Sequence, residues 1–248
     1  RSSRKKRKGQ DIQVDAEIDF SEMVFGAERE INLRKSVRCE RCSGTGGEPG
    51  TGKKTCPTCK GSGRIEKISR SFFGSFSQVS VCSDCQGEGK IYEKKCSKCG
   101  GDGKVKSDEK IGISIPAGIS NGQTISIQGA GEAGEKGAVS GDLFITVHVR
   151  HHEKFSRKGL DILSNEYITF SKAALGGEIE IETAYGKLIL KIPQGTQSGE
   201  IFRIREKGIP EINGRGIGNH LAKIIVKIPK KLNREQKRII EELEREGF

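Results

Sequence analysis

Four Cys-x-x-Cys-x-Gly-x-Gly motifs constrain this chain more than any other feature of its sequence. They begin at Cys39, Cys56, Cys82 and Cys96, and together they contain all eight cysteines. A structural zinc ion takes four thiolate or imidazole ligands in a tetrahedron, so two Cys-x-x-Cys turns complete one site. The four motifs therefore predict two closed zinc sites, with two zinc ions per chain and no cysteine left over.

The glycines of each motif favour metal binding over other thiol chemistry. A turn that wraps a metal points backbone N–H groups at sulfur and then reverses sharply, and glycine reaches the required positive φ at little steric cost. Disulfides and redox-active cysteines are the alternatives, but a redox Cys-x-x-Cys pair normally opens a helix within a βαβ unit. Each pair here runs into x-Gly-x-Gly, which does not open a helix.

The distribution of charge argues against a nucleic-acid-binding protein. The net charge is +11, but residues 1–8 contain six of the lysines and arginines. Such a run is more often a solvated linker than a binding patch, and the thiolates of two zinc sites would lower the net charge further. We therefore expect residues 1–10 to be a basic linker stub and do not expect nucleic acid as a partner.

The sequence indicates a protein of the cytoplasm. No apolar run approaches the length of about eighteen residues that spans a bilayer, and no signal-like apolar segment is present, so no membrane association is expected. Cysteines held in metal-binding motifs fit a reducing compartment. The only methionine is Met23, so the sequence does not begin at its own initiator and we expect a segment upstream.

The chain also repeats itself outside the cysteine motifs. Nine residues between Asp11 and Ile31 recur 150 positions later without a gap, and the Ile-Pro-x-Gly sequence at 115–118 recurs at 192–195, an offset of 77. The two offsets differ by 73 residues. An insertion of about that size in the first copy explains the difference, and the cysteine motifs at 39–103 fill it.

The insertion predicts how the motifs pair. An inserted module leaves and re-enters its host at neighbouring points, so its two ends should lie close together. We therefore predict nested pairing, with one zinc ion near the host domain and the other at the far tip. The expected ligands are Cys39, Cys42, Cys96 and Cys99 for zinc 1, and Cys56, Cys59, Cys82 and Cys85 for zinc 2. Sequential pairing, which closes shorter loops, is the alternative.

The two copies show the alternation of a β fold. Apolar and polar residues alternate with period 2 from Asp11 to Phe20, the pattern of a strand with one buried face. Residues 21–26 and 171–176 predict single helical turns that end at glycine. Later strands are expected at 111–115, 124–127, 142–149, 178–182, 187–192, 201–205 and 221–228.

The predicted fold class is mainly β, with two small β-sandwich-like domains in tandem, the first carrying the inserted two-zinc cysteine-rich module, and a C-terminal helix. The first domain is expected at 11–150, interrupted by the zinc module at 39–103, and the second at 151–231. We expect the sheets to be antiparallel.

The last segment, residues 232–248, changes to a helical period. Asn233 can cap a helix with Gln236 three residues later, and Ile239, Ile240 and Leu243 mark one apolar stripe. A helix of about fourteen residues is marginal alone in water, so the stripe must pack on something. It could dock on its own second β domain, or it could pair with the same helix of a second chain. We assign it to dimerisation, which gives a homodimer.

These features together resemble the DnaJ-type co-chaperones that contain a cysteine-rich zinc module. The resemblance covers Asp11 to Phe248 and rests on the four cysteine motifs, on Ile-Pro-Ala-Gly at 115–118, on Gly-Asp-Leu at 141–143 and on Ala-Leu-Gly-Gly-Glu at 174–178. It implies tandem client-binding β-sandwiches, nested zinc pairing and a dimer joined through the C-terminal helix. It implies a protein that is not an enzyme, but that binds unfolded polypeptides, prevents their aggregation and passes them to a DnaK-type ATPase chaperone.

The resemblance also implies a client-binding pocket. In this family a client adds an extended segment beside a strand of the first β domain and places an apolar side chain in a pocket there. The matching positions are Ile12, Ile31 and Leu33, with Ile111 and Ile145 from later strands. The alternative is that these are ordinary core residues of a sandwich, because the period-2 pattern alone does not separate the two.

The sequence departs from the family in one respect. The His-Pro-Asp triplet on which DnaK activation depends does not occur in these 248 residues. We therefore expect the chain as it stands to bind clients without stimulating an ATPase. Two other functions stay open, namely a thiol–disulfide exchange enzyme that uses the Cys-x-x-Cys pairs and a zinc-dependent nucleic-acid binder.

Overall fold

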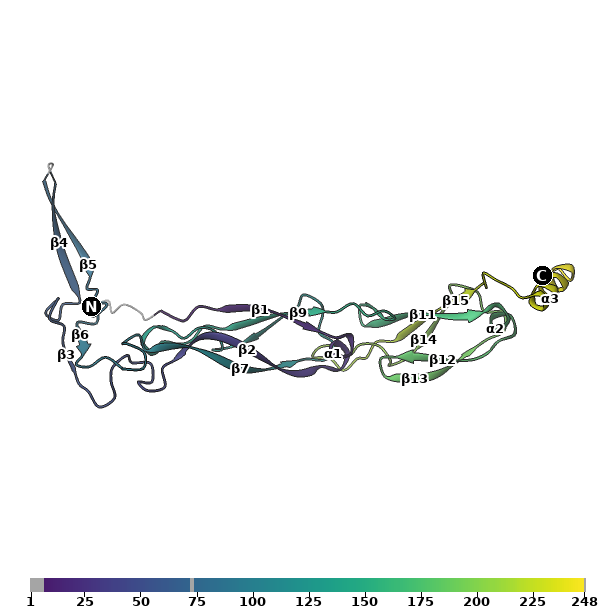
Figure 1. The fold of residues 1–248 in the computed structure, drawn as a ribbon, viewed down its shortest axis with the longest axis horizontal. Coiled ribbons are helices and arrows are strands. Elements are labelled where there is room, and N and C mark those ends of the chain that lie inside the picture. Colours follow the sequence, from purple (N-terminus) through teal and green to yellow (C-terminus); the bar gives the residue numbers. More distant parts are fainter. Residues whose placement is uncertain (1–6, 72–73, 248) are drawn as a thin grey trace. The chain divides into compact units, whose positions relative to one another are not determined.

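The computed structural model describes residues 7–71 and 74–247, so the expected basic stub lies mostly outside the described residues (Figure 1). The strands are β1 (Ile12–Ile18), β2 (Ala27–Arg38), β3 (Lys53–Thr55), β4 (Arg64–Ser71), β5 (Gly74–Val81), β6 (Lys90–Tyr92), β7 (Lys104–Ile115), β8 (Thr124–Ile127), β9 (Leu143–Val149), β10 (Ser156–Lys158), β11 (Asp161–Thr169), β12 (Gly177–Thr183), β13 (Gly186–Ile192), β14 (Ile201–Ile204) and β15 (His220–Lys227). The helices are α1 (Phe20–Phe25), the 3₁₀ turn η1 (Glu135–Gly137), α2 (Phe170–Leu175) and α3 (Arg234–Arg245). The predicted mainly β fold class with a C-terminal helix is confirmed.

The same order of elements occurs twice. β1, α1 and β2 correspond to β11, α2 and β12, while β7, β8 and β9 correspond to β13, β14 and β15. Both short helices were expected, and both end at a glycine, Gly26 or Gly176, with φ near 76°. A Cβ at either position would lie less than 3 Å from the backbone of the Ile-Pro-x-Gly segment at the end of β7 or β13. The short helix therefore packs on this segment in the same way in both copies.

The cysteine motifs occupy the position of a hairpin turn. In the second copy β12 and β13 form a hairpin that closes with Thr183 opposite Gly186. The corresponding strands of the first copy, β2 and β7, also pair with each other, but residues 39–103 lie between them. Within this segment β3 pairs with β6 and β4 pairs with β5.

The main sheets are not wholly antiparallel as expected. Their strand orders are β1-β9-β8 in the first copy and β10-β11-β15-β14 in the second. β11 and β15 run parallel, with Ile162 opposite His220 and Ile168 opposite Val226. Parallel neighbours need a long crossover, and the chain from α2 to β14 supplies it here. The expectation of antiparallel sheets was wrong because alternation reports which face is buried, and not the direction of the neighbouring strand.

The chain divides into two compact units. Unit 1 contains Glu28–Ile113 and Gly122–His148, and unit 2 contains Glu17–Ala27, Ser114–Asn121 and the chain from Val149 onward. α1 belongs to unit 2 because it packs on the 114–121 turn, where the Gly118 N–H donates to the Met23 carbonyl at 2.8 Å. The division therefore does not follow the boundary expected at residue 150, and the domain limits given above stay a prediction.

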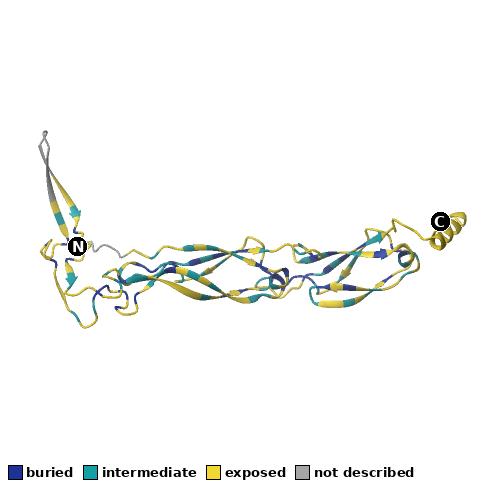
Figure 2. Ribbon diagram, in the orientation of Figure 1, coloured by how far each residue is buried: buried dark blue, intermediate teal, exposed yellow. Residues whose placement is uncertain are grey.

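Buried residues alternate with exposed ones along the strands (Figure 2). In unit 1 the side chains of Leu143, Ile145 and Val147 on β9 are fully buried. In unit 2 a core cluster joins β11, α2, β13 and β15 through Ile168, Ala173, Ile192 and Ile224. Among residues 7–71 and 74–247, no helix combines the length and the apolar character that crossing a membrane requires.

Candidate metal centres and expected client-binding positions

The eight cysteines lie in two groups of four. Cys39, Cys42, Cys96 and Cys99 form the root group, and Cys56, Cys59, Cys82 and Cys85 form the tip group. Within each group all four Sγ atoms lie within 4.8 Å of one another. The structure thus brings the first motif to the fourth and the second to the third, which is the nested order and not the sequential one.

The distances between sulfurs fit zinc. The Sγ–Sγ distances across paired motifs are 3.8 Å for Cys39–Cys96, Cys42–Cys99 and Cys56–Cys82, and 3.6 Å for Cys59–Cys85. Zinc–sulfur bonds of about 2.3 Å in a tetrahedron place the sulfurs about 3.8 Å apart. A disulfide requires a separation of about 2.05 Å, and all eight cysteines are free. Both groups therefore have the donor set and the size of a structural tetrathiolate zinc site.

Glycines lock the paired motifs together by reciprocal contacts. The last glycine of each motif accepts a hydrogen bond from the N–H of the first cysteine of the partner motif, at 2.9–3.0 Å. The pairs are Cys39 with Gly103, Cys96 with Gly46, Cys56 with Gly89, and Cys82 with Gly63.

The same four glycines leave no room for a side chain. A Cβ on Gly46, Gly63, Gly89 or Gly103 would lie 2.3–2.5 Å from a glycine carbonyl oxygen of the partner motif. Their φ angles are also positive, between 71° and 82°. The sequence explains these glycines by the turn within one motif, whereas the structure shows that the partner motif requires them as well.

Backbone N–H groups point at the sulfurs. The N–H groups of Gly46, Gly63 and Gly103 donate to Cys42, Cys59 and Cys99 at 3.2–3.3 Å. Burial opposes the Cys42 thiolate, but the N–H groups of Gly46 and Gly44 and the neighbouring thiols outweigh it and lower its pKa to about 7. The pKa of Cys59 falls to about 7 by the same balance.

Other thiols of both groups resist ionisation. Burial raises the pKa of Cys85 and of Cys99 to about 11. A divalent cation supplies the charge that offsets this burial, so complete ionisation of a group is linked to metal binding, and binding releases protons. The chemistry of the donor set therefore fits a resident zinc ion better than four free thiols.

Side chains between the cysteines also bridge the paired motifs. At the root, Lys98 forms an ion pair with Glu40 at 2.8 Å, and Glu48 accepts from the Ser97 N–H at 2.9 Å. At the tip, the Thr58 hydroxyl donates to Asp84. Small apolar contacts complete each group, with Val105 against the root and Ile65 and Ile91 against the tip. These exposed polar pairs support the pairing but are worth little individually.

The five expected client-pocket positions lie on neighbouring strands of the first copy. Ile12 lies on β1 and Ile145 on β9 of one sheet, while Ile31 and Leu33 on β2 and Ile111 on β7 lie on the paired strands of the other. Ile145 is fully buried, and the other four are half-buried.

The second copy provides an internal comparison for these positions. Ile162 and Ile181, which correspond to Ile12 and Ile31, are no more than 1% exposed. A sandwich of this kind can thus bury both side chains completely, and the first copy does not do so. The residual exposure is what an accessible apolar pocket needs.

Comparison with known proteins places this architecture in a family. The family model "DnaJ C terminal domain" matches residues 12–229. The chain belongs to this DnaJ family. "Chaperone protein DnaJ" of Ruminiclostridium cellulolyticum is 45% identical over 236 residues, which cover 95% of this chain and 62% of the relative. The proteins of the same name from Brevibacillus choshinensis and Acetivibrio thermocellus are 44% and 43% identical, over 63% and 61% of their lengths. The chain thus spans a little over three fifths of these DnaJ relatives.

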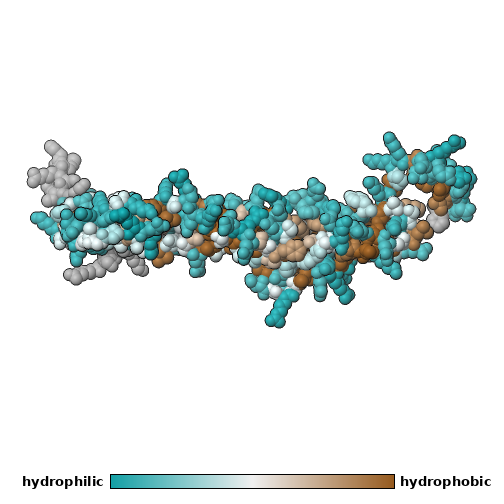
Figure 3. Space-filling view, turned by 60° about the horizontal axis from the view of Figure 1, so that its bottom comes forward, coloured by the Kyte–Doolittle hydropathy of each residue, from teal (hydrophilic) through white to brown (hydrophobic). Residues whose placement is uncertain are grey.

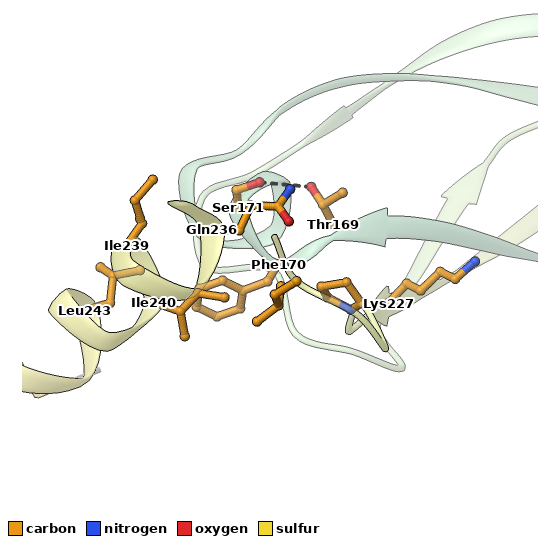
Figure 4. A pocket seen from close by; sticks show the side chains of 10 residues that line it. Thr169, Phe170, Ser171, Lys227, Gln236, Ile239, Ile240 and Leu243 are labelled. Carbon is orange, nitrogen blue, oxygen red and sulfur yellow. Dashed lines mark hydrogen bonds between the residues drawn. The ribbon is translucent and has the colours of Figure 1, made fainter. Parts of the chain in front are cut away.

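The C-terminal helix of this DnaJ family member presents its apolar stripe to solvent. Asn233 caps α3 in a capping box with Gln236, as predicted. Ile239, Ile240 and Leu243 remain 47%, 47% and 37% exposed. They line a groove of about 530 Å³ together with Phe170 of α2, and Figure 4 shows Ile240 alongside the Phe170 ring. Apolar side chains also gather over the part of unit 2 near α3 (Figure 3). The helix thus contacts its own unit without being covered by it.

Proposed function

We propose that this chain is the client-holding part of a DnaJ co-chaperone of the cytoplasm. It binds unfolded polypeptides, prevents their aggregation and passes them to a DnaK-type ATPase chaperone. It acts by binding and not by catalysis, and its two zinc ions are structural. Family membership together with the half-buried apolar set on β1, β2 and β7 carries this proposal.

The geometry of β2 supports strand addition as the binding mode. Within the described residues β2 has a sheet neighbour on one side only, which is β7. Its other edge is covered near Ser36, where the Ala133 N–H donates to the Ser36 carbonyl at 2.8 Å. Along the remaining edge an extended client pairs through backbone hydrogen bonds, which tolerate many sequences, while the pocket formed around Ile12, Ile31 and Leu33 selects an apolar side chain.

A test of the proposed client pocket, which we call the client groove, combines Ile31→Ser with Leu33→Ser. The readout is light scattering from citrate synthase diluted out of guanidinium, without ATP. We expect the unchanged chain to suppress aggregation and the double variant to lose most of this effect, because the pocket no longer buries an apolar side chain. Ile189→Ser is the matched control, because Ile189 is 68% exposed on β13 and lies outside the groove. Failure of the unchanged chain to suppress aggregation would refute the proposal.

The zinc sites are tested by paired substitutions and elemental analysis. Cys56→Ser with Cys59→Ser should lose the tip zinc ion and leave one zinc ion per chain with the host domain folded. Cys39→Ser with Cys42→Ser should lose the root ion and loosen the base of the insertion. The variant with all four substitutions should retain no zinc ion. One remaining zinc ion per chain in that variant would show that Cys39, Cys42, Cys56 and Cys59 share a site, which is the sequential pairing. Thiols that react freely in the metal-loaded chain would instead favour thiol–disulfide exchange.

We also propose that α3 joins two chains into a homodimer. The exposed stripe of Ile239, Ile240 and Leu243 supports this assignment, because a helix of this length gains its stability from packing. Ile239→Glu with Leu243→Glu should convert a dimer into a monomer in sedimentation equilibrium, whereas Glu244→Gln should not. A chain that is already monomeric at tens of micromolar would contradict the proposal.

A further inference from the structure

The outer face of the main sheet in unit 2 has an unusual composition. Side chains alternate between the two faces of a strand, and the inner face here is identified by the buried residues Ile162, Ile168, Ala222 and Ile224. The opposite face of β11, β14 and β15 carries a set that we name the outer patch: Tyr167, Ile201, Arg203, Leu221, Lys223 and Ile225. Cross-strand register places these side chains together, because Tyr167 lies opposite Ile225, Arg203 opposite Leu221, and Ile201 opposite Lys223.

The apolar members of the outer patch are open to solvent. Tyr167 is 65% exposed and Ile201 is 56% exposed, while Leu221 and Ile225 are half-buried. Neighbouring side chains on a sheet shield one another in part, but they do not cover this face. Contiguous exposed apolar surface of this kind is typical of an interaction site.

The first copy shows that the fold does not require the patch. The offsets of 150 and 77 residues place Glu17, Thr124, Ser126, Phe144, Thr146 and His148 at the same six positions. Thr124 lies opposite Thr146 and Ser126 opposite Phe144, the same register as in the second copy. Five of the six residues are polar. Since the same sheet folds with a polar outer face, the apolar side chains of the outer patch serve something other than folding.

The two copies also differ in how charge is balanced. In the first copy Arg150 pairs with Glu17 at 3.3 Å and the His148 ring forms a hydrogen bond with Asp15 at 2.9 Å, so polar groups of the outer face have partners on the same face. In the second copy neither Arg203 nor Lys223 has an ion-pair partner in the part of the chain that the structure describes. β14 and β15 contain no acidic residue. The outer patch therefore combines apolar surface with two uncompensated positive charges.

We propose that the outer patch binds an acidic segment of a partner protein that also carries aromatic or aliphatic anchors. The anchors cover Tyr167, Ile201 and Ile225, and carboxylates pair with Arg203 and Lys223. Charge complementarity selects this occupant, because a basic or neutral apolar segment would leave both cations unpaired. This surface is separate from the client groove on β2 and goes beyond the proposed function.

The first copy also supplies the test variants. Tyr167→Glu with Ile201→Thr removes the anchors and adds one carboxylate, and Arg203→Ser with Lys223→Thr removes the positive charges. Each introduces a residue that the first copy already carries at the same place in the fold. The probe is a fluorescein-labelled peptide of alternating Glu and Leu with a central Phe, compared with the same peptide in which Gln replaces Glu. Binding to the full chain is followed by fluorescence anisotropy at two salt concentrations.

We expect each double variant to weaken binding of the acidic peptide by about tenfold or more, since central aromatic anchors and matched charges dominate such interfaces. The Gln peptide should bind the unchanged chain about as weakly, and added salt should weaken only the acidic peptide. Ile189→Ser, the exposed control position on β13, should leave the affinity unchanged. Circular dichroism checks that each variant folds. If a double variant does not fold, the single variant Lys223→Thr still tests the proposal.

Three results would overturn the proposal. Unchanged affinity in both double variants would show that the patch binds nothing acidic. A loss caused only by Ile31→Ser would place the peptide in the client groove. A change in the sedimentation mass of the chain on mutation of the patch would show that a second copy of the chain covers this face. None of these results depends on whether the chain suppresses client aggregation, so this inference and the proposed function fail separately.

Discussion

Gly46→Ala should damage the root zinc site through the partner motif and not through its own turn. The added Cβ would lie 2.3 Å from the Gly101 carbonyl oxygen, and the φ of 82° is unfavourable for any residue with a Cβ. The conformational strain costs about 1–2 kcal/mol. Relief of the contact must separate the motifs and weaken the hydrogen bond from the Cys96 N–H to the Gly46 carbonyl, which is worth about 1 kcal/mol.

The expected total is about 3 kcal/mol, or a zinc affinity of the root site that is lower by roughly a hundredfold. Gly50→Ala is the matched control. Its φ of 79° carries the same conformational strain, but a Cβ there would meet no atom within 4 Å. This strain of about 1–2 kcal/mol should lower the affinity by only about tenfold. Gly63→Ala should reproduce the effect at the tip, where the Cβ would lie 2.5 Å from the Gly87 carbonyl oxygen.

The assay is competition for zinc with a chromophoric chelator, which resolves the release of two ions per chain. Gly46→Ala should weaken the root ion alone and Gly63→Ala the tip ion alone. If Gly46→Ala and Gly50→Ala released zinc alike, the conformational strain of the turn would account for the whole effect, and the contact between paired motifs would contribute nothing to zinc affinity.

Three further predictions concern unit 2 and strand β2 of unit 1. Burial lowers the pKa of His220. As the pH falls through about 6.5, the histidine of the unfolded chain therefore takes up a proton before that of the folded chain does. The free energy of unfolding should be at its full value above that pH and should decrease below it. His220→Leu, which introduces the residue of the first copy, should remove this pH dependence from thermal melting, and an unaltered profile would contradict it. Arg157→Lys should lower the free energy of unfolding by about 2 kcal/mol. The Arg157 guanidinium donates to the carbonyls of Ile119 at 2.6 Å and Gly118 at 3.1 Å, and a lysine ammonium does not reproduce these two donors in one plane. Urea denaturation measures the change, and a midpoint equal to that of the unchanged chain would count against it. Lys35→Met should destabilise unit 1, since Lys35 is buried and donates to the Ala130 carbonyl at 2.6 Å while it pairs with Glu109 at 2.9 Å; limited proteolysis should then cut the 130–137 segment faster than in the unchanged chain.

The composition of the two cysteine clusters could be predicted from the sequence, because it follows from the number and spacing of the motifs. Eight cysteines in four motifs make two tetrads, and the two repeat offsets locate the motifs as an insertion whose ends must meet. The short helices and the cap at Asn233 were also predictable, because each depends on local signals that lie within a few residues.

Other features depend on contacts between segments that lie far apart in the sequence, and the sequence does not show which segments meet. β7 begins at Lys104, well before the expected strand at 111–115, because residues 106–110 are exposed on both faces and only pairing with β2 holds them extended. The parallel pairing of β11 with β15 and the packing of α1 in unit 2 likewise follow from tertiary contacts. The steric demand on Gly46 comes from the motif that begins 50 residues later.

The place where the cysteine module joins its host gives the fold a modular character. The second copy closes the equivalent strands with a short turn between Thr183 and Gly186, so the host sheet does not need residues 39–103 to form. At the root, the Cys39 N–H donates to the Gly103 carbonyl at 3.0 Å, which holds the two ends of the module together. The module thus connects β2 to β7 as the short turn connects β12 to β13. We therefore expect that another insert can replace the module without changes to the β domain that carries it, provided that its ends lie as close together as those of a hairpin turn.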